Sequence, residues 1–142
     1  MTSRRSSRWP AAFAVFALAM LCRPSLAWAQ TRWKEIGRTS SGNSVYVDPR
    51  SIKHSGNLVS GTVRVVFKEP VQTAKGIWKS SRTALTFDCT KKSVAAKENV
   101  YYADERGTKV TDRKVNKQPG FGPVLGGSPG ELALRSLCDG NR

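Results

Sequence analysis

The most regular feature of the sequence is an alternation of apolar and polar residues that runs from 58 to 68. One side of this stretch collects Val59, Val63, Val65 and Phe67, and the other collects Ser60, Thr62, Arg64 and Lys68. A period of two that is rich in β-branched residues predicts a β-strand with one buried face and one face in water. We expect Glu69-Pro70 to end this strand, because proline lacks a backbone N–H and restricts the residue before it.

Shorter stretches of the same character predict further strands, and clusters of glycine, asparagine, aspartate and proline between them predict turns. The predicted strands cover 33–38, 44–48, 82–89, 94–103 and 108–115. The predicted connections are turns at 39–43, 55–57 and 104–107 and a loop over 72–79. A helix over 93–99 is the alternative to the fourth strand, although the neighbouring strands favour a strand there too.

The C-terminal region has a different pattern. Residues 119–127 are rich in glycine and proline and predict an irregular linker. A helix start follows, with a serine cap, a proline at the first helical position and a glutamate at the third, supplied by Ser128, Pro129 and Glu131. The helix is predicted to end near Cys138, which shares its apolar side with Leu134 four residues earlier.

The first 29 residues have the three zones of a secretory signal peptide. The basic zone is made by Arg4, Arg5 and Arg8. An apolar run over 11–21 follows, and small residues then flank Trp28 at a predicted cleavage site after Ala29. The apolar run is too short for a transmembrane helix, which needs about 20 residues.

Cleavage of this leader over 1–29 leaves one domain over 30–142, of about 113 residues, which is enough for a modest core. The net charge falls from +14 to about +10 because four arginines leave with the leader. We therefore expect an exported protein, periplasmic or at the cell surface or secreted, with no stable membrane span. Lipidation at Cys22 in place of cleavage after Ala29 is the alternative.

Two cysteines remain after the leader is removed, Cys89 and Cys138. In an oxidising compartment they allow one intramolecular bond, so we expect a disulfide between them. Cys89 shares the apolar face of its predicted strand with Phe87, and Cys138 lies on the apolar side of the predicted helix. The predicted fold is therefore α+β, an antiparallel sheet of about five or six strands with one C-terminal helix disulfide-tethered to a sheet face.

No group of residues in the sequence assembles a catalytic site. His54 is the single histidine, and it lies in the turn-like segment 53–56, so we expect an exposed turn residue without a nucleophile or an orienting partner. The glycines of 119–127 lack the spacing of a phosphate-binding loop. A metal site needs three or four ligands, and both cysteines are used by the predicted disulfide. We therefore predict a protein that is not an enzyme and takes no metal or cofactor.

Basic residues outnumber acidic ones by 24 to 10, which favours acidic proteins or polyanions as partners. Nucleic acid is disfavoured by export and by the scarcity of aromatic residues among the basic ones. One basic cluster lies on the last predicted strand and contains Lys109, Arg113 and Lys114. These residues either guard an edge strand against aggregation or form a patch for an acidic partner.

Several different short motifs follow one another along the predicted domain. They are Trp33 with Ile36, Val45-Tyr46-Val47-Asp48 with Ser51-Ile52, Asp88-Cys89, Tyr101-Tyr102, and Ser128-Pro129-Gly130 before Cys138. In order and spacing, over about residues 33–140, they resemble the surface-adhesin protein E family of exported bacterial proteins. The resemblance implies a six-stranded antiparallel sheet with a C-terminal helix tethered to it by a disulfide.

The resemblance also implies a function. The family's named member is a lipid-anchored dimer on a pathogen's surface that binds matrix and serum proteins such as vitronectin, laminin and plasminogen. The segment that contacts vitronectin there is equivalent to the one that holds Lys75, Lys79 and Arg82 here. We therefore expect an adhesin-like binding protein with a basic surface, and a homodimer is implied as well. A periplasmic structural or accessory protein without a host ligand is the alternative.

Overall fold

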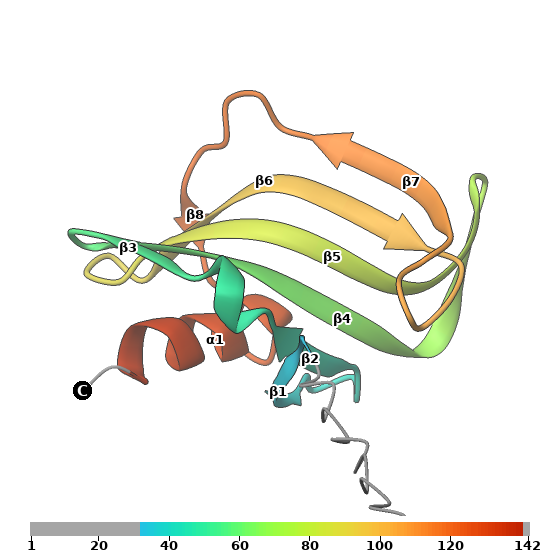
Figure 1. The fold of residues 1–142 in the computed structure, drawn as a ribbon, viewed down its shortest axis with the longest axis horizontal. Coiled ribbons are helices and arrows are strands. Elements are labelled where there is room, and N and C mark those ends of the chain that lie inside the picture. Colours follow the sequence, from blue (N-terminus) through green and yellow to red (C-terminus); the bar gives the residue numbers. More distant parts are fainter. Residues whose placement is uncertain (1–31, 141–142) are drawn as a thin grey trace, which may run out of the picture.

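The computed structural model describes residues 32–140, so the predicted leader over 1–29 and Cys22 lie outside the described residues. One antiparallel sheet is covered on one face by a C-terminal helix, which confirms the predicted α+β class (Figure 1). The strands are β1 (Lys34–Arg38), β2 (Ser44–Val47), β3 (Lys53–Ser55), β4 (Leu58–Thr73), β5 (Gly76–Asp88), β6 (Ser93–Tyr102), β7 (Val110–Val115) and β8 (Gly122–Pro123). The helical elements are η1 (Pro49–Ser51), α1 (Pro129–Leu134) and η2 (Arg135–Asp139), and the last two follow each other directly. Over residues 32–140 no helix has both the length and the apolar character needed to cross a bilayer.

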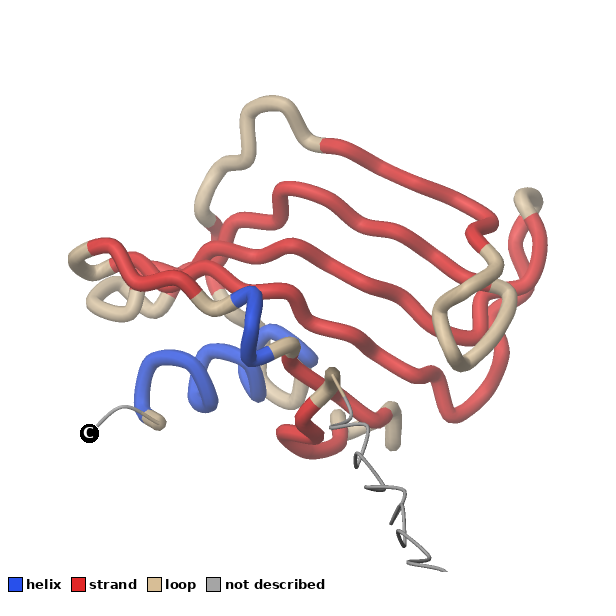
Figure 2. Tube along the Cα trace, viewed as in Figure 1, coloured by secondary structure: helices blue, strands red, loops and turns tan. Residues whose placement is uncertain are grey.

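The strands are ordered β1-β2-β4-β5-β6-β7, and each pair is antiparallel. The short strands β3 and β8 pair with β4 and β6 outside this path. Figure 2 shows β4 and β5 running through the middle of the sheet. The main path therefore has the predicted six strands, while the two short strands have too few residues to produce a pattern of their own.

The core lies between the helix and the β2–β4–β5 part of the sheet. Its buried residues are Val45, Val47, Val59, Val63, Phe87, Ala133 and Leu137. Each valine buried there contributes about 1.5–3 kcal/mol relative to exposure. Gly61 also faces the helix, and a Cβ at this position would lie only 3.3 Å from the side chain of Leu137. The missing side chain therefore lets the helix approach the sheet closely.

The start of the helix has the predicted cap. The Ser128 hydroxyl accepts a hydrogen bond from the Glu131 N–H at 3.2 Å, and the Glu131 carboxylate accepts one from the Gly127 N–H at 2.6 Å. Cys138, near the other end of the helix, forms the predicted disulfide with Cys89, with 5.6 Å between their Cα atoms. Cys89 directly follows β5, so the bond fastens the helix to the end of a central strand.

The predicted end of the long strand at Pro70 is wrong. β4 continues to Thr73, and its pairing with β5 shifts between Val66 and Val71. Residues 67–70 have no partners in this register, so Pro70 occupies a place where no ladder N–H is required. The predicted loop over 72–79 is also wrong. β4 runs to Thr73 and β5 begins at Gly76, so only a tight hairpin turn separates the two strands.

Two local predictions concern neighbouring segments. The alternative helix over 93–99 is wrong, because this stretch belongs to β6 and pairs with β5 along its length. The predicted hairpin connection after β6 is confirmed, with β7 beginning at Val110. His54 is exposed, as predicted, but it lies in the short strand β3 and not in a turn.

Candidate functional site

The face of the sheet opposite the helix carries a row of arginine and aromatic side chains. Arg64 in β4 is the register partner of Tyr46 in β2 and of Arg82 in β5. Its neighbours Val63 and Val65 are buried, so Arg64 points to the opposite face. Residues paired directly across antiparallel strands share a face. The two guanidinium groups therefore lie next to each other on the uncovered face.

Trp33 lies over this pair of arginines. The Cζ atoms of Arg64 and Arg82 are 5.8 Å and 5.5 Å from the centre of the indole ring. Tyr46 lies 5.8 Å from the Cζ of Arg64, and Tyr102 lies 5.4 Å from that of Arg82. These distances fall within the range of about 6 Å for cation–π contacts. Three aromatic rings thus hold the two guanidinium groups in position.

Trp33 is held by the segment that enters β1. The Nε atom of Arg32 donates to Oδ2 of Asp48 at 2.7 Å, and the Arg50 N–H donates to its Oδ1 at 3.1 Å. Asp48 is only 1 % exposed. Burial favours its neutral form, but the hydrogen bonds from Arg32 and Arg50 outweigh burial and lower the pKa of Asp48. A buried and charged Asp48 therefore anchors the segment that carries Trp33.

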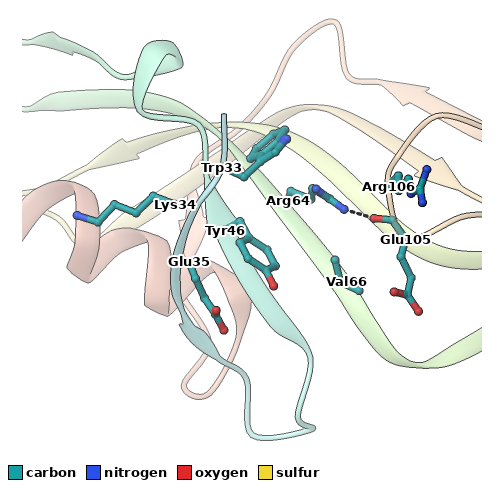
Figure 3. Close-up of a pocket in the computed structure, with 8 residues that line it drawn as sticks. All are labelled: Trp33, Lys34, Glu35, Tyr46, Arg64, Val66, Glu105 and Arg106. Atoms are coloured by element: carbon teal, nitrogen blue, oxygen red, sulfur yellow. Dashed lines mark hydrogen bonds between the residues drawn. The ribbon is translucent and has the colours of Figure 1, made fainter. Parts of the chain in front are cut away.

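The turn between β6 and β7 supplies the opposite wall of the site. The Asp104 carboxylate accepts hydrogen bonds from the Lys109 N–H at 2.7 Å and the Thr108 N–H at 3.0 Å, and the pKa of Asp104 is lowered mainly by the first. The Ser80 hydroxyl donates to the Asp104 carbonyl at 2.7 Å, which ties the turn to β5. The turn thereby presents the carbonyl of Glu105, which accepts a hydrogen bond from the guanidinium group of Arg64 (Figure 3).

These elements surround an open pocket of about 650 Å³, here named the Trp33 pocket. It is lined by Trp33, Lys34, Glu35, Tyr46, Arg64, Val66, Glu105 and Arg106. Figure 3 shows Arg64 between the aromatic side chains and the turn that carries Glu105. The side chains of Glu35 and Glu105 extend away from Arg64. The pocket therefore has a basic centre and acidic groups only at its rim.

Arg64 and Arg82 form no ion pair with the described part of the chain, although the charges of Asp104 and Glu105 act on Arg64 from a longer distance. Residues 32–140 form five ion pairs, and neither arginine takes part in any of them. The Nε atom of each is shielded from solvent and has no hydrogen-bond acceptor among the same residues. Burial and the charge of Arg82 lower the pKa of Arg64, and the charges of Asp104 and Glu105 only partly offset this. An anionic group beside the two guanidinium groups would relieve their repulsion.

The structure separates the six basic residues that the sequence analysis singled out. Arg82 and Arg113 belong to the same row, because Val100 of β6 pairs with both. Lys79 and Lys109 line a shallow hollow beside the turn that borders the Trp33 pocket.

The other two lie away from this row. The Nζ atom of Lys75 donates to Oδ1 of Asp112 at 2.7 Å. The Nζ atom of Lys114 lies 5.8 Å from each of the stacked rings of Trp78 and Tyr101. Because Asp112 pairs with Tyr101 and Lys114 follows two residues later, these groups share the face opposite to Arg82.

None of the eight residues that line the pocket was predicted as a site residue, including Trp33, Tyr46 and Arg64. Trp33 and Tyr46 stood out only as motif residues, and Arg64 only as a polar position of an alternating strand. The usable signal is an arginine in the middle of a long strand with no acidic residue near it in sequence. That signal gains meaning only when the strand order is known.

The remaining candidate chemistry is spread over the fold. His54 is exposed in β3, remote in sequence and strand position from the arginine row. Within residues 32–140 no three histidine, cysteine, aspartate or glutamate side chains come together as metal ligands would. The Trp33 pocket offers donors and aromatic surface, so its chemistry is that of binding an anion.

Comparisons with known proteins agree with this architecture. The family model of the surface-adhesin protein E matches residues 33–139. Two structures of Haemophilus influenzae protein E superimpose with TM-scores of 0.56 and 0.54 at 13% identity, covering 78% of this chain and 90% and 86% of those chains. Protein E from non-typeable Haemophilus influenzae gives a TM-score of 0.53 at 13% identity, covering 78% of this chain and 77% of that one. A comparison with curated proteins gave no match. Because the family model spans most of its sequence, the chain belongs to the surface-adhesin protein E family.

Proposed function

We propose that this protein is an exported, non-enzymatic binding protein of the cell envelope that acts as an adhesin and takes acidic protein or polyanion partners on its basic surface. Its membership of a surface-adhesin family supports the adhesive role. The single observation that carries the basic-surface part is the pair of arginines, Arg64 and Arg82, neither of which forms an ion pair among residues 32–140.

Charge supports an acidic partner in two ways. The net charge, +14 for the full chain and about +10 after cleavage of the predicted leader, attracts acidic surfaces at a distance and raises association rates at low salt. At contact, arginine and tryptophan are the residue types that most often carry the binding energy of protein interfaces. Trp33, Arg64 and Arg82 bring these types together on one open face. Host matrix and serum proteins, which the family resemblance implies, are the partners that we propose.

A periplasmic accessory role is the second candidate. It is favoured by the basic residues that are already neutralised within the protein, since Lys75 pairs with Asp112 and Arg113 pairs with Glu98. In that case the basic surface is generic, and the protein binds no matrix protein.

Surface accessibility on intact cells separates these candidates. The adhesin proposal expects that an external protease or an antibody reaches the protein in cells with an intact outer membrane. Full protection, together with release by osmotic shock, would reject the adhesive role and support the periplasmic one. The intact mass of the exported protein checks cleavage after Ala29 against lipidation at Cys22 in the same sample.

Partner binding is tested with charge reversal at Lys75, Lys79 and Arg82. We expect saturable, salt-sensitive binding to immobilised matrix or serum proteins that the triple reversal weakens. Unchanged binding would exclude this segment. A separate reversal of Lys75 alone measures how much of its effect comes from releasing Asp112.

A further inference from the structure

We infer that the Trp33 pocket binds a carboxylate side chain from an acidic peptide segment of a protein partner. This inference rests on the proposed binding function and assigns it a place and a ligand chemistry. The carboxylate would face Arg64 and Arg82, with Trp33 and Tyr46 packing against the neighbouring parts of the peptide.

The first argument concerns charge. Two adjacent arginines, both partly buried, lie without a carboxylate within 4.0 Å in residues 32–140. Partly buried like charges weaken each other's ionised state, and an opposite charge between them reverses that effect. A guanidinium group also matches a carboxylate in shape, because two parallel N–H donors meet two oxygens. The two arginines therefore lack a carboxylate at contact distance, and a peptide side chain can supply one.

The second argument concerns pre-organisation. Arg64 is fixed by the carbonyl of Glu105 and by the ring of Tyr46, and Arg82 by the ring of Tyr102. Trp33 lies over both. Side chains that are already ordered lose little conformational entropy when a ligand binds. Such an arrangement is unusual for surface arginines, whose long side chains are otherwise mobile.

The third argument distinguishes a peptide from a continuous polyanion. The carboxylates of Glu35 and Glu105 line the rim and extend away from Arg64 (Figure 3). They repel a stiff chain that carries fixed negative charge at every unit, whereas a flexible acidic peptide can place one carboxylate at the centre and turn its other side chains away from the rim. The volume of about 650 Å³ leaves room for more than one side chain. The aromatic walls provide apolar contact area of the kind found at protein interfaces.

Trp33 offers a direct signal for the test. After the predicted cleavage two tryptophans remain, Trp33 and Trp78. A Trp78→Phe background leaves the indole of the pocket as the only tryptophan of the exported chain. The probe is an acetylated and amidated peptide of six glutamates, and its matched control is the corresponding peptide of six glutamines. We expect saturable quenching or shift of the fluorescence with the first peptide and none with the second.

Two double variants test the site by calorimetry. Arg64→Gln with Arg82→Gln should weaken hexaglutamate binding at least tenfold. Lys53→Gln with Lys91→Gln removes the same charge from exposed positions in β3 and after β5, and should change binding by less than twofold. If the arginine variant fails to fold by circular dichroism, Trp33→Ala replaces it as the test of the site, and we expect at least a threefold loss of binding there.

The contrary outcomes are distinct. If both double variants weaken hexaglutamate binding equally, the pocket assignment is overturned. It is also overturned if the wild-type protein does not bind hexaglutamate. Heparin fragments that bind as tightly as hexaglutamate and depend on the same arginines overturn the choice of a peptide. None of these results rejects the proposed adhesive role. That role is rejected only if the protein on intact cells is fully protected from external protease.

Discussion

The two faces of the sheet are built from the same strands but for opposite purposes. On the covered face, Val63 packs with Phe87 and the helix in an apolar core. On the open face, Arg64 follows Val63 directly in sequence and meets Arg82, and neither arginine forms an ion pair with residues 32–140. Burial contributes stability on one face, while the other retains unfavourable electrostatics. The difference indicates that the open face is organised for a ligand, since a structural role would be better served by an ion pair or an apolar residue.

A second comparison sharpens the first. At Lys75 the chain also places a cation on the sheet surface, but Asp112 neutralises it at 2.7 Å. Hydrogen bonding from Lys75 lowers the pKa of Asp112, which keeps its carboxylate ionised at neutral pH. The fold therefore supplies an ion-pair partner to Lys75 and supplies none to Arg64.

Removal of the disulfide should have the largest effect. Cys89→Ser with Cys138→Ser releases the covering helix and a loop spanning 49 residues, and we expect a loss of about 4 kcal/mol in the free energy of unfolding. Urea unfolding monitored by circular dichroism measures it. A loss below about 1 kcal/mol would show that the helix is held by packing alone.

A valine truncation in the core should come next. Val63→Ala removes buried methyl groups at 1 % exposure and should cost about 2 kcal/mol, with unchanged hexaglutamate binding. Thr62→Ala, one residue earlier on the open face, is the matched control and should cost less than about 1 kcal/mol. Equal losses would contradict the division of labour between the faces.

The anchor of Trp33 should give a smaller and pH-dependent effect. Asp48 has a lowered pKa, so the stability it contributes is complete above its ordinary pKa of 3.8 and is lost as the pH falls through the lower folded value. Asp48→Asn should therefore melt below the wild type at pH 7, and the gap should close at pH values below 3.8. Thermal melts across this range check it, and a gap that persists in acid would assign the effect to packing.

The smallest change in stability is expected on the open face. Arg82→Gln removes two cation–π contacts but also relieves the repulsion of Arg64, so we expect a change of less than about 1 kcal/mol in either direction. Urea unfolding of the ligand-free protein measures it. A loss comparable to that of Val63→Ala would mean that the arginine row supports the fold.

The sequence was informative wherever one local pattern decides the structure. The alternation around Val63, the serine cap at Ser128 and the pair of remaining cysteines each have a strong physical meaning by themselves. The bulge around Pro70 was missed because a proline stops a paired strand but not an unpaired stretch within one. Local signals therefore predicted the elements and the disulfide, and missed an irregularity that depends on the partner strand.

The site itself depends on distant residues. The Trp33 pocket joins the entry to β1, two strands and the turn after β6, and no local pattern links these segments. Lys75 was predicted as a partner-binding residue from the family resemblance, and its neutralisation by Asp112 was missed because the two residues are 37 positions apart. Both facts become visible only when the strand order and register are known.

The alternation of β4 gives the disulfide a further significance. A slip of one residue between β4 and β5 would turn arginines inward and valines outward together. The same register therefore determines both the core face and the arginine face. Cys89 closes β5 next to the turn that opens β4, where its N–H donates to the Asn57 carbonyl at 2.9 Å. Leu137, next to Cys138, packs against Gly61 of β4, so the covalent link holds both strands against the same stretch of helix. An oxidising compartment would therefore stabilise the strands that carry the Trp33 pocket through the same disulfide that holds the helix.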